Sequence, residues 1–171
     1  DGGVIACSCG GPADGESVLK EVRDVVVRDC DFHLRYPLWH ASRFVLSHST
    51  MDEGTRAPLW YTADGKLDHC DIRGVKCLRE CDRTEIADCQ IVSPEFGWKC
   101  RGVKVADTEI TSEYLFLECR DMTLDRFKMH GKYSFQYVEN VVIRDSDLDT
   151  KDAFWHAKNV TVINSTIKGE Y

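Results

Sequence analysis

The feature that most constrains this chain is a degenerate repeat of about nineteen residues that runs along nearly all of it. Large apolar residues recur at one position of every repeat, namely Val27, Leu46, Leu67, Ile86, Val105, Leu124, Ile143 and Val162. The steps between them are nineteen residues, except for one of twenty-one. A second ladder follows five residues later with the same steps, and comprises Phe32, Met51, Ile72, Ile91, Ile110, Met129, Leu148 and Ile167.

Two further positions of the repeat keep their character. Eight residues before the first ladder lie Leu19, Leu38, Leu59, Leu78, Gly97, Phe116, Phe135 and Phe154, of which only Gly97 is not large and apolar. Three residues after these lies a column of mostly small side chains, which are Val22, Ala41, Thr62, Cys81, Cys100, Cys119, Val138 and Ala157. Equal spacing of four columns indicates one structural unit repeated along the chain.

The local pattern is that of strands, because apolar and polar residues alternate around the first ladder, as in Val160-Thr161-Val162. Short strands with identical spacing bury their apolar faces by stacking coil upon coil, about 4.8 Å apart. We therefore predict an all-β, single-domain, right-handed parallel β-helix of about eight coils, the hand following from the rule for parallel crossovers. Residues 16–171 form this helix, residues 1–15 are a glycine-rich lead-in or partial first coil, and the two extra residues form a bulge near 52–55.

Composition argues against two classes of partner. No apolar run approaches the roughly 20 residues that a transmembrane helix needs, so we expect no membrane partner. The formal net charge is −7, without a basic stripe along the chain. Because nucleic-acid binding depends on clustered Lys and Arg, we expect no nucleic-acid partner either.

The nine cysteines fall mainly on core positions of the repeat. Several share a column of small, mildly polar residues that is expected to stack inside the helix, consisting of Cys30, Ser49, Cys70, Cys89, Thr108, Phe127, Ser146 and Ser165. An odd number of buried cysteines favours reduced thiols and a cytoplasmic location. The alternatives are disulfides between stacked neighbours, or zinc at Cys77 and Cys81 or at Cys7 and Cys9. Neither pair has a second pair nearby, so we expect no metal and no cofactor.

Several motifs add a family resemblance, and they are 13–17 (ADGES), 35–40 (RYPLWH), 133–137 (YSFQY), 152–156 (DAFWH) and 169–171 (GEY). With these the chain resembles an uncharacterised bacterial family of pectate-lyase-like β-helix proteins, domain-of-unknown-function family 3737. The resemblance implies a right-handed β-helix and a bacterial source, and carries no activity. Family members look longer at the carboxyl end. We therefore expect the last coil to be covered by further chain, by an end-to-end homo-oligomer or by another protein.

Two adjacent columns break the monotony of the repeat. The first holds all four tryptophans and reads Lys20, Trp39, Trp60, Arg79, Trp98, Leu117, Gln136 and Trp155. The second has no aliphatic member and reads Glu21, His40, Tyr61, Glu80, Lys99, Glu118, Tyr137 and His156. Functional columns need not be uniform, so these two are the candidate site.

An outward-facing tryptophan column would suit a linear glycan. Indole faces stack on sugar rings, the polar column contacts hydroxyl groups, and Arg79 pairs with a uronic carboxylate. The expected substrate-binding residues are Trp39, His40, Trp60, Tyr61, Arg79, Trp98, Tyr137, Trp155 and His156. The alternative is that the column stabilises the wall, with Arg79 held between two indoles by cation–π contacts. Which way the column faces stays open, because adjacent residues of a flat strand point to opposite sides.

Glu80, Lys99 and Glu118 lie on three consecutive coils and are the candidate catalytic residues. Two coils separate the glutamates by about 9–10 Å at the backbone, near the upper end of the 6.5–9.5 Å range of inverting glycosidases. Lys99 would separate their pKa values, so that one acts as acid and the other as base. The alternative is an ion-pair ladder without a substrate.

The function that these patterns favour is binding of a polysaccharide or oligosaccharide along one wall, with hydrolysis as its catalytic extension. An enzyme of this kind would be a glycoside hydrolase or a polysaccharide lyase. The rival is a non-enzymatic β-solenoid scaffold for protein–protein interaction, since β-helices serve both purposes.

Overall fold

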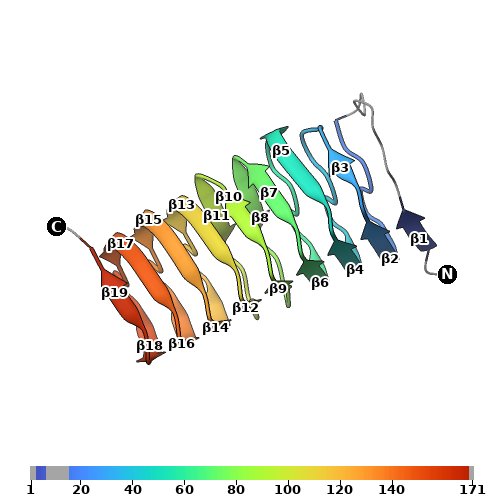
Figure 1. The fold of residues 1–171 in the computed structure, drawn as a ribbon. Helices are drawn as coiled ribbons and strands as arrows, with labels where there is room; N and C mark the ends of the chain where they lie inside the picture. Colours follow the sequence, from blue (N-terminus) through green and yellow to red (C-terminus); the bar gives the residue numbers. More distant parts are fainter. Residues whose placement is uncertain (1–2, 7–15, 170–171) are drawn as a thin grey trace.

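The computed structural model describes residues 3–6 and 16–169. Its described part contains strands and turns, without a helix, and is a parallel β-solenoid of about eight turns with a repeat of about 19 residues. The predicted fold is confirmed. The coils stack from the blue amino end to the red carboxyl end of Figure 1, and the termini lie at opposite ends of the stack.

Two parallel sheets run along the solenoid (Figure 1). The first has nine strands, which are β1 (Gly3–Ala6), β2 (Arg23–Arg28), β4 (Ser42–Ser47), β6 (Ala63–Asp68), β9 (Glu85–Ala87), β12 (Lys104–Ala106), β14 (Arg120–Asp125), β16 (Glu139–Arg144) and β18 (Lys158–Ile163). The second has ten, which are β3 (Asp31–Phe32), β5 (Thr50–Thr55), β7 (Asp71–Gly74), β8 (Lys76–Arg79), β10 (Gln90–Val92), β11 (Glu95–Trp98), β13 (Glu109–Leu115), β15 (Lys128–Ser134), β17 (Asp147–Ala153) and β19 (Thr166–Lys168).

Strand register matches the ladders of the sequence. Val27 pairs with Leu46 and Leu46 with Leu67 in the first sheet. Ile91 pairs with Ile110 in the second. The one longer step is absorbed where predicted, since the pairing of β5 with β7 shifts register between Met51 and Thr55. At the amino end β1 pairs in parallel with β2, and residues 1–2 and 7–15 of the predicted lead-in lie outside the described part.

The core is the space between the sheets, filled by the inward columns. Leu46, Leu67 and Leu124 are fully buried. The small polar column also points inward, as expected, and its hydroxyl groups accept backbone hydrogen bonds from the preceding coil. Ser49 Oγ accepts from the N–H of Cys30 at 3.1 Å, and Thr108 Oγ1 from that of Cys89 at 3.2 Å. These bonds satisfy polar atoms that would otherwise be costly to bury.

All seven cysteines of the described part are buried and free of disulfides, as predicted. Burial raises the pKa of the Cys77 thiol to about 12 and also raises the pKa of Cys81, because a thiolate is poorly solvated there. Cys7 and Cys9 lie outside the described residues. No helical segment of the described residues has the length and apolar character that a membrane crossing requires.

Candidate functional site

The tryptophan column lies on a bend of the backbone between the two sheets. On the second coil Leu38 and His40 both have a φ of 57°, in the left-handed region. These two residues flank Trp39, and the bend resolves the orientation left open by the sequence. Leu38 and Ala41 are fully buried, whereas Trp39 is half-buried and His40 is exposed. Two adjacent side chains thus reach the same outer surface, which a flat strand would not allow.

The same bend recurs on every described coil, because the residues at these two positions all have positive φ. For a bulky residue this conformation costs about 1–2 kcal/mol. Regular hydrogen bonds to neighbouring coils hold it: the N–H of His40 donates to the Trp60 carbonyl at 2.9 Å, and that of Tyr61 donates to the Arg79 carbonyl at 2.9 Å. A strained backbone conformation persists where the surrounding contacts hold it in place, and the coil-to-coil hydrogen bonds do so here.

The centre of the tryptophan column is a stack of alternating rings and charge. The Arg79 guanidinium carbon lies 5.1 Å from the centroid of Trp60 and 5.2 Å from that of Trp98, within cation–π range of both. The indole N–H groups are also used inside the protein. That of Trp60 donates to the Lys76 carbonyl at 2.6 Å, and that of Trp98 to the Tyr114 carbonyl at 3.1 Å.

This arrangement has a consequence for ligand binding. Arg79 covers one face of each flanking indole, and its side chain is 25% exposed and 3.8 Å from the Glu80 carboxylate. The two indole rings and the guanidinium group between them therefore stack along the solenoid, and each has its contact partner within the protein. The geometry supports the alternative that the central column stabilises the wall, and glycan binding by Trp60, Arg79 and Trp98 stays a prediction.

Further rings extend this wall toward both ends. Trp39 contacts Tyr36 edge-on, with ring centroids 5.1 Å apart, and its ring lies tilted against that of Trp60 at a centroid distance of 5.4 Å. The rings of His40 and Tyr61 stack with centroids 4.8 Å apart. The sequence prediction missed other aromatic members of the wall, Tyr114 and Tyr133, which stack at 4.9 Å. They belong to a neighbouring column with Tyr36, from which they lie seventy-eight and ninety-seven residues away, that is, four and five repeats plus the two extra residues. This spacing could have revealed them in the sequence.

The three candidate catalytic residues lie on one exposed column but do not form one cluster. Lys99 Nζ lies 4.0 Å from Glu118, with side chains 46% and 51% exposed. Glu80 is paired instead with Arg79. Each glutamate thus faces a cation on the solvated surface, which is the arrangement of the ion-pair alternative. Their catalytic role stays a prediction.

An open depression of about 620 Å³ lies beside Glu118 at the carboxyl end of this column. Its lining comprises Glu118, Arg120, Tyr137, Val138, Glu139, His156 and Lys158. Three of these are predicted site residues: Glu118, Tyr137 and His156. Tyr137 is 52% exposed and stacks on His156 at 5.0 Å, and Trp155 meets His156 edge-on at 5.8 Å. Arg120 lies 3.7 Å from Glu139.

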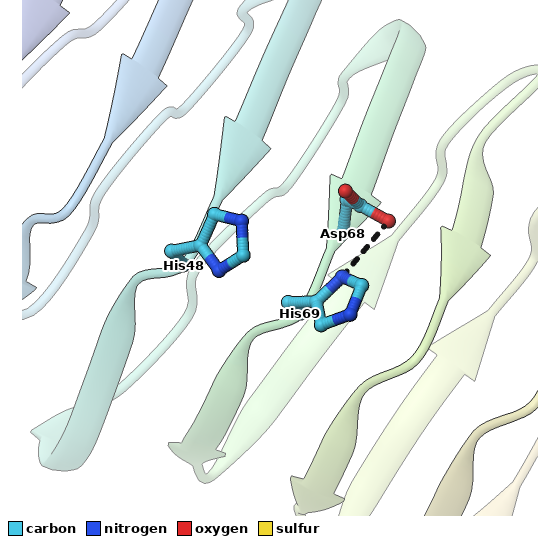
Figure 2. Close-up of side chains that lie close together, drawn as sticks. All are labelled: His48, Asp68 and His69. Carbon is cyan, nitrogen blue, oxygen red and sulfur yellow. Dashed lines mark ion pairs between the residues drawn. The ribbon is translucent and has the colours of Figure 1, made fainter.

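A second polar cluster lies on a different edge of the solenoid and was not predicted. His48, Asp68 and His69 bring two imidazoles and a carboxylate together, and they are the one such group of potential metal ligands among residues 3–6 and 16–169 (Figure 2). A consecutive column of Asp29, His48, His69 and Asp88 was the signal in the sequence.

Comparison with known proteins yields one match. Residues 5–171 match the family model described as "Protein of unknown function (DUF3737)". The predicted membership of family 3737 is therefore confirmed, whereas the relationship to pectate lyases and the bacterial source stay predictions. No curated protein and no solved structure matches the chain.

Proposed function

Because the chain belongs to the DUF3737 family, whose description assigns no activity, its function has to be inferred from its own surface, and we propose that it binds a carbohydrate. The binding site is the depression lined by Glu118, Arg120, Tyr137 and His156. The observation that carries this proposal is the combination, in one open hollow, of a half-exposed aromatic ring with closely spaced donors and acceptors.

Sugar recognition needs both of these elements. An aromatic ring contacts the C–H face of a sugar, and polar groups around it contact the hydroxyls. Tyr137 supplies the ring, Arg120 and Lys158 supply donors, and Glu118 and Glu139 supply acceptors. The two cations balance the two carboxylates in charge, so the lining suits a neutral, hydroxyl-rich sugar better than a polyuronate.

Binding is the proposed activity rather than hydrolysis. A glycosidase needs a carboxyl group that is free to act as the general acid. Here Glu118 lies 4.0 Å from Lys99 and Glu139 lies 3.7 Å from Arg120, so both carboxyl groups of the depression are engaged in ion pairs, as in the ion-pair alternative. The proposal also needs no kinship with pectate lyases, which stays an expectation from resemblance.

The chain supplies a matched control for the test. His40 and Tyr61 repeat the histidine–tyrosine stack of the depression at 4.8 Å on earlier coils, but they do not line it. A glycan array identifies an oligosaccharide ligand, and calorimetry then measures its affinity. We expect Tyr137→Ala to weaken binding by about 1–3 kcal/mol through lost contact area, and Tyr61→Ala to leave affinity within about twofold.

Two outcomes would contradict the proposal. One is the absence of any glycan bound above background, which would favour the scaffold alternative. The other is an equal loss of affinity in Tyr137→Ala and Tyr61→Ala, with both variants folded by circular dichroism. Release of reducing ends from the bound glycan, abolished by Glu118→Gln, would instead show that the site hydrolyses its ligand.

A further inference from the structure

The cluster of His48, Asp68 and His69, here called the histidine corner, lies where strands of the first sheet end. β4 ends at Ser47 and β6 ends at Asp68, so each histidine directly follows a strand. Both histidines adopt the left-handed conformation, with φ of 48° for His48 and 52° for His69. The turn projects both rings outward from the same edge on neighbouring coils (Figure 2).

The ligand atoms of the histidine corner converge. One ligand atom from each of the three residues lies within 4.8 Å of the other two. The imidazole centroids are 5.0 Å apart with an interplanar angle of 31°, and Nδ1 of His69 lies 3.3 Å from Oδ1 of Asp68 (Figure 2). His48 and His69 are exposed and Asp68 is half-buried, so an ion reaches all three from solvent.

The backbone beneath the cluster is held by the coil-to-coil ladder. The N–H of His48 donates to the Asp68 carbonyl at 3.0 Å, and that of His69 donates to the Ala87 carbonyl at 3.1 Å. Ser47 pairs with Asp68 in the parallel sheet. The backbone of the three residues is thus held at fixed spacing, which lowers the conformational entropy lost when their side chains converge on a ligand.

We propose that the histidine corner binds a divalent transition-metal ion of the zinc type through His48, Asp68 and His69. Imidazole and carboxylate together suit Zn²⁺, Co²⁺ or Ni²⁺, whereas Mg²⁺ and Ca²⁺ prefer sites made of oxygen alone. Zinc–ligand distances of about 2.0–2.2 Å in a tetrahedron place donor atoms about 3.4 Å apart. The His69–Asp68 pair already has this spacing, at 3.3 Å, and a ligand atom of His48 lies within 4.8 Å of both.

The surroundings add electrostatic support. Asp29 and Asp88 occupy the same turn position on the coils before and after the histidines, and the chain as a whole carries a formal charge of −7. Three protein ligands leave the fourth position of a tetrahedral ion open for water or substrate. This site is separate from the proposed carbohydrate site, since it lies at the opposite end of the first-sheet strands from the tryptophan column.

Other histidines of the chain serve as controls. His130 also faces carboxylates, with Nδ1 at 3.2 Å from Asp149 and Nε2 at 3.9 Å from Glu109, but it has no second imidazole in its cluster. His130→Ala therefore removes an exposed histidine that also lies beside carboxylates, without touching the proposed ligands. A background carrying Cys7→Ser and Cys9→Ser removes the two cysteines outside the described residues as competing ligands.

The test is calorimetric titration of the full chain in this background with Zn²⁺, accompanied by Co²⁺ absorption spectra. We expect one equivalent to bind, with a Co²⁺ spectrum lacking a thiolate charge-transfer band. Loss of an outer-shell partner weakens metal sites by about 10–100-fold, so loss of a direct ligand in His48→Ala or His69→Ala should weaken binding at least about 100-fold. His130→Ala should stay within about twofold.

A second measurement on the protein with its native histidines guards against misfolded variants. In histidine-ring NMR spectra, Zn²⁺ should shift the resonances of His48 and His69 and leave those of His33 and His130 in place. The proposal is overturned if Zn²⁺ does not bind, if the His48→Ala/His69→Ala protein binds it undiminished, or if the shifted resonances belong to other histidines.

Discussion

Gly97 offers a sharp test of how neighbouring coils fit together. It is the one glycine in a column of leucine and phenylalanine, so a repeat consensus would replace it. The structure shows why it is small. A Cβ at this position would lie 2.5 Å from Cδ1 and 2.6 Å from Cε1 of Phe116 on the next coil. The Phe116 ring is fully buried and contacts Phe96 at 5.8 Å and Phe135 at 5.7 Å, so it has little room to move.

We therefore expect Gly97→Ala to destabilise the protein, although alanine is nearer the consensus. Two effects contribute, and Gly102 separates them. Gly97 and Gly102 share a φ of +69°, but a Cβ on Gly102 would meet its nearest neighbour, in Arg83, at 3.4 Å. Gly102→Ala thus reports the backbone effect alone. Overpacking of a tight core costs about 1–3 kcal/mol, and this is the expected difference in unfolding free energy between the two variants.

Urea unfolding and thermal melts of the two variants measure this difference. For a protein of this size each kcal/mol lowers Tm by roughly 2–4 °C. Adding Phe116→Leu to Gly97→Ala should recover part of the loss, giving a coupling energy of at least about 0.5 kcal/mol in a double-mutant cycle. Equal stability of Gly97→Ala and Gly102→Ala, or strict additivity in the cycle, would refute the argument that the ring and the glycine are fitted to each other.

Three other predictions concern the thiols, a surface pair and the tryptophan stack. The seven buried cysteines should resist a thiol reagent in the native protein and react on denaturation, and rapid native labelling of several would contradict their burial. The Asp52 carboxylate 2.7 Å from His33 raises the pKa of that imidazole above 6.5, so NMR titration should show a pKa that Asp52→Asn lowers. This pair stabilises the native protein at pH values below the ordinary histidine pKa, and the stabilisation is lost as the pH rises through the raised pKa. A contribution of the pair to the free energy of unfolding that is smaller at pH 6 than at pH 8 would contradict this prediction. Arg79→Ala should lower the unfolding free energy by about 0.5–2 kcal/mol through loss of both cation–π contacts, and Arg79→Lys should lose less; an unchanged Tm in Arg79→Ala would show that the stack is not stabilising.

The fold could be predicted because every coil of a solenoid has the same structure, so the sequence pattern that specifies it recurs along the chain. Each apolar column is sampled once per coil, so a single unusual residue such as Gly97 does not hide it. Even the longer coil was placed correctly, since only one step departs from nineteen. The family, by contrast, was predicted from five short motifs, and the family model over residues 5–171 confirms it.

The site was harder to predict because a column gives the position of a residue and not the direction of its side chain. The outward orientation of Trp39 depends on left-handed φ values at Leu38 and His40, and a leucine does not signal that conformation. Ring orientation is equally hidden, and it decides whether an indole face meets a ligand or Arg79. The His48 and His69 pair was visible in the sequence, but Asp68 joins it from an adjacent column.

Stacking also determines where chemistry remains available on this protein. In a column, every side chain has neighbours about 4.8 Å away on both sides, so complementary residues neutralise one another along the stack. Asp24 and Arg43 do this through two hydrogen bonds at 2.6 and 2.7 Å, and Trp60, Arg79 and Trp98 do it through ring faces. The imidazoles of His48 and His69 cannot complement each other in this way. Their ring nitrogens, together with the Asp68 carboxylate, remain as donor atoms that the proposed metal ion would share.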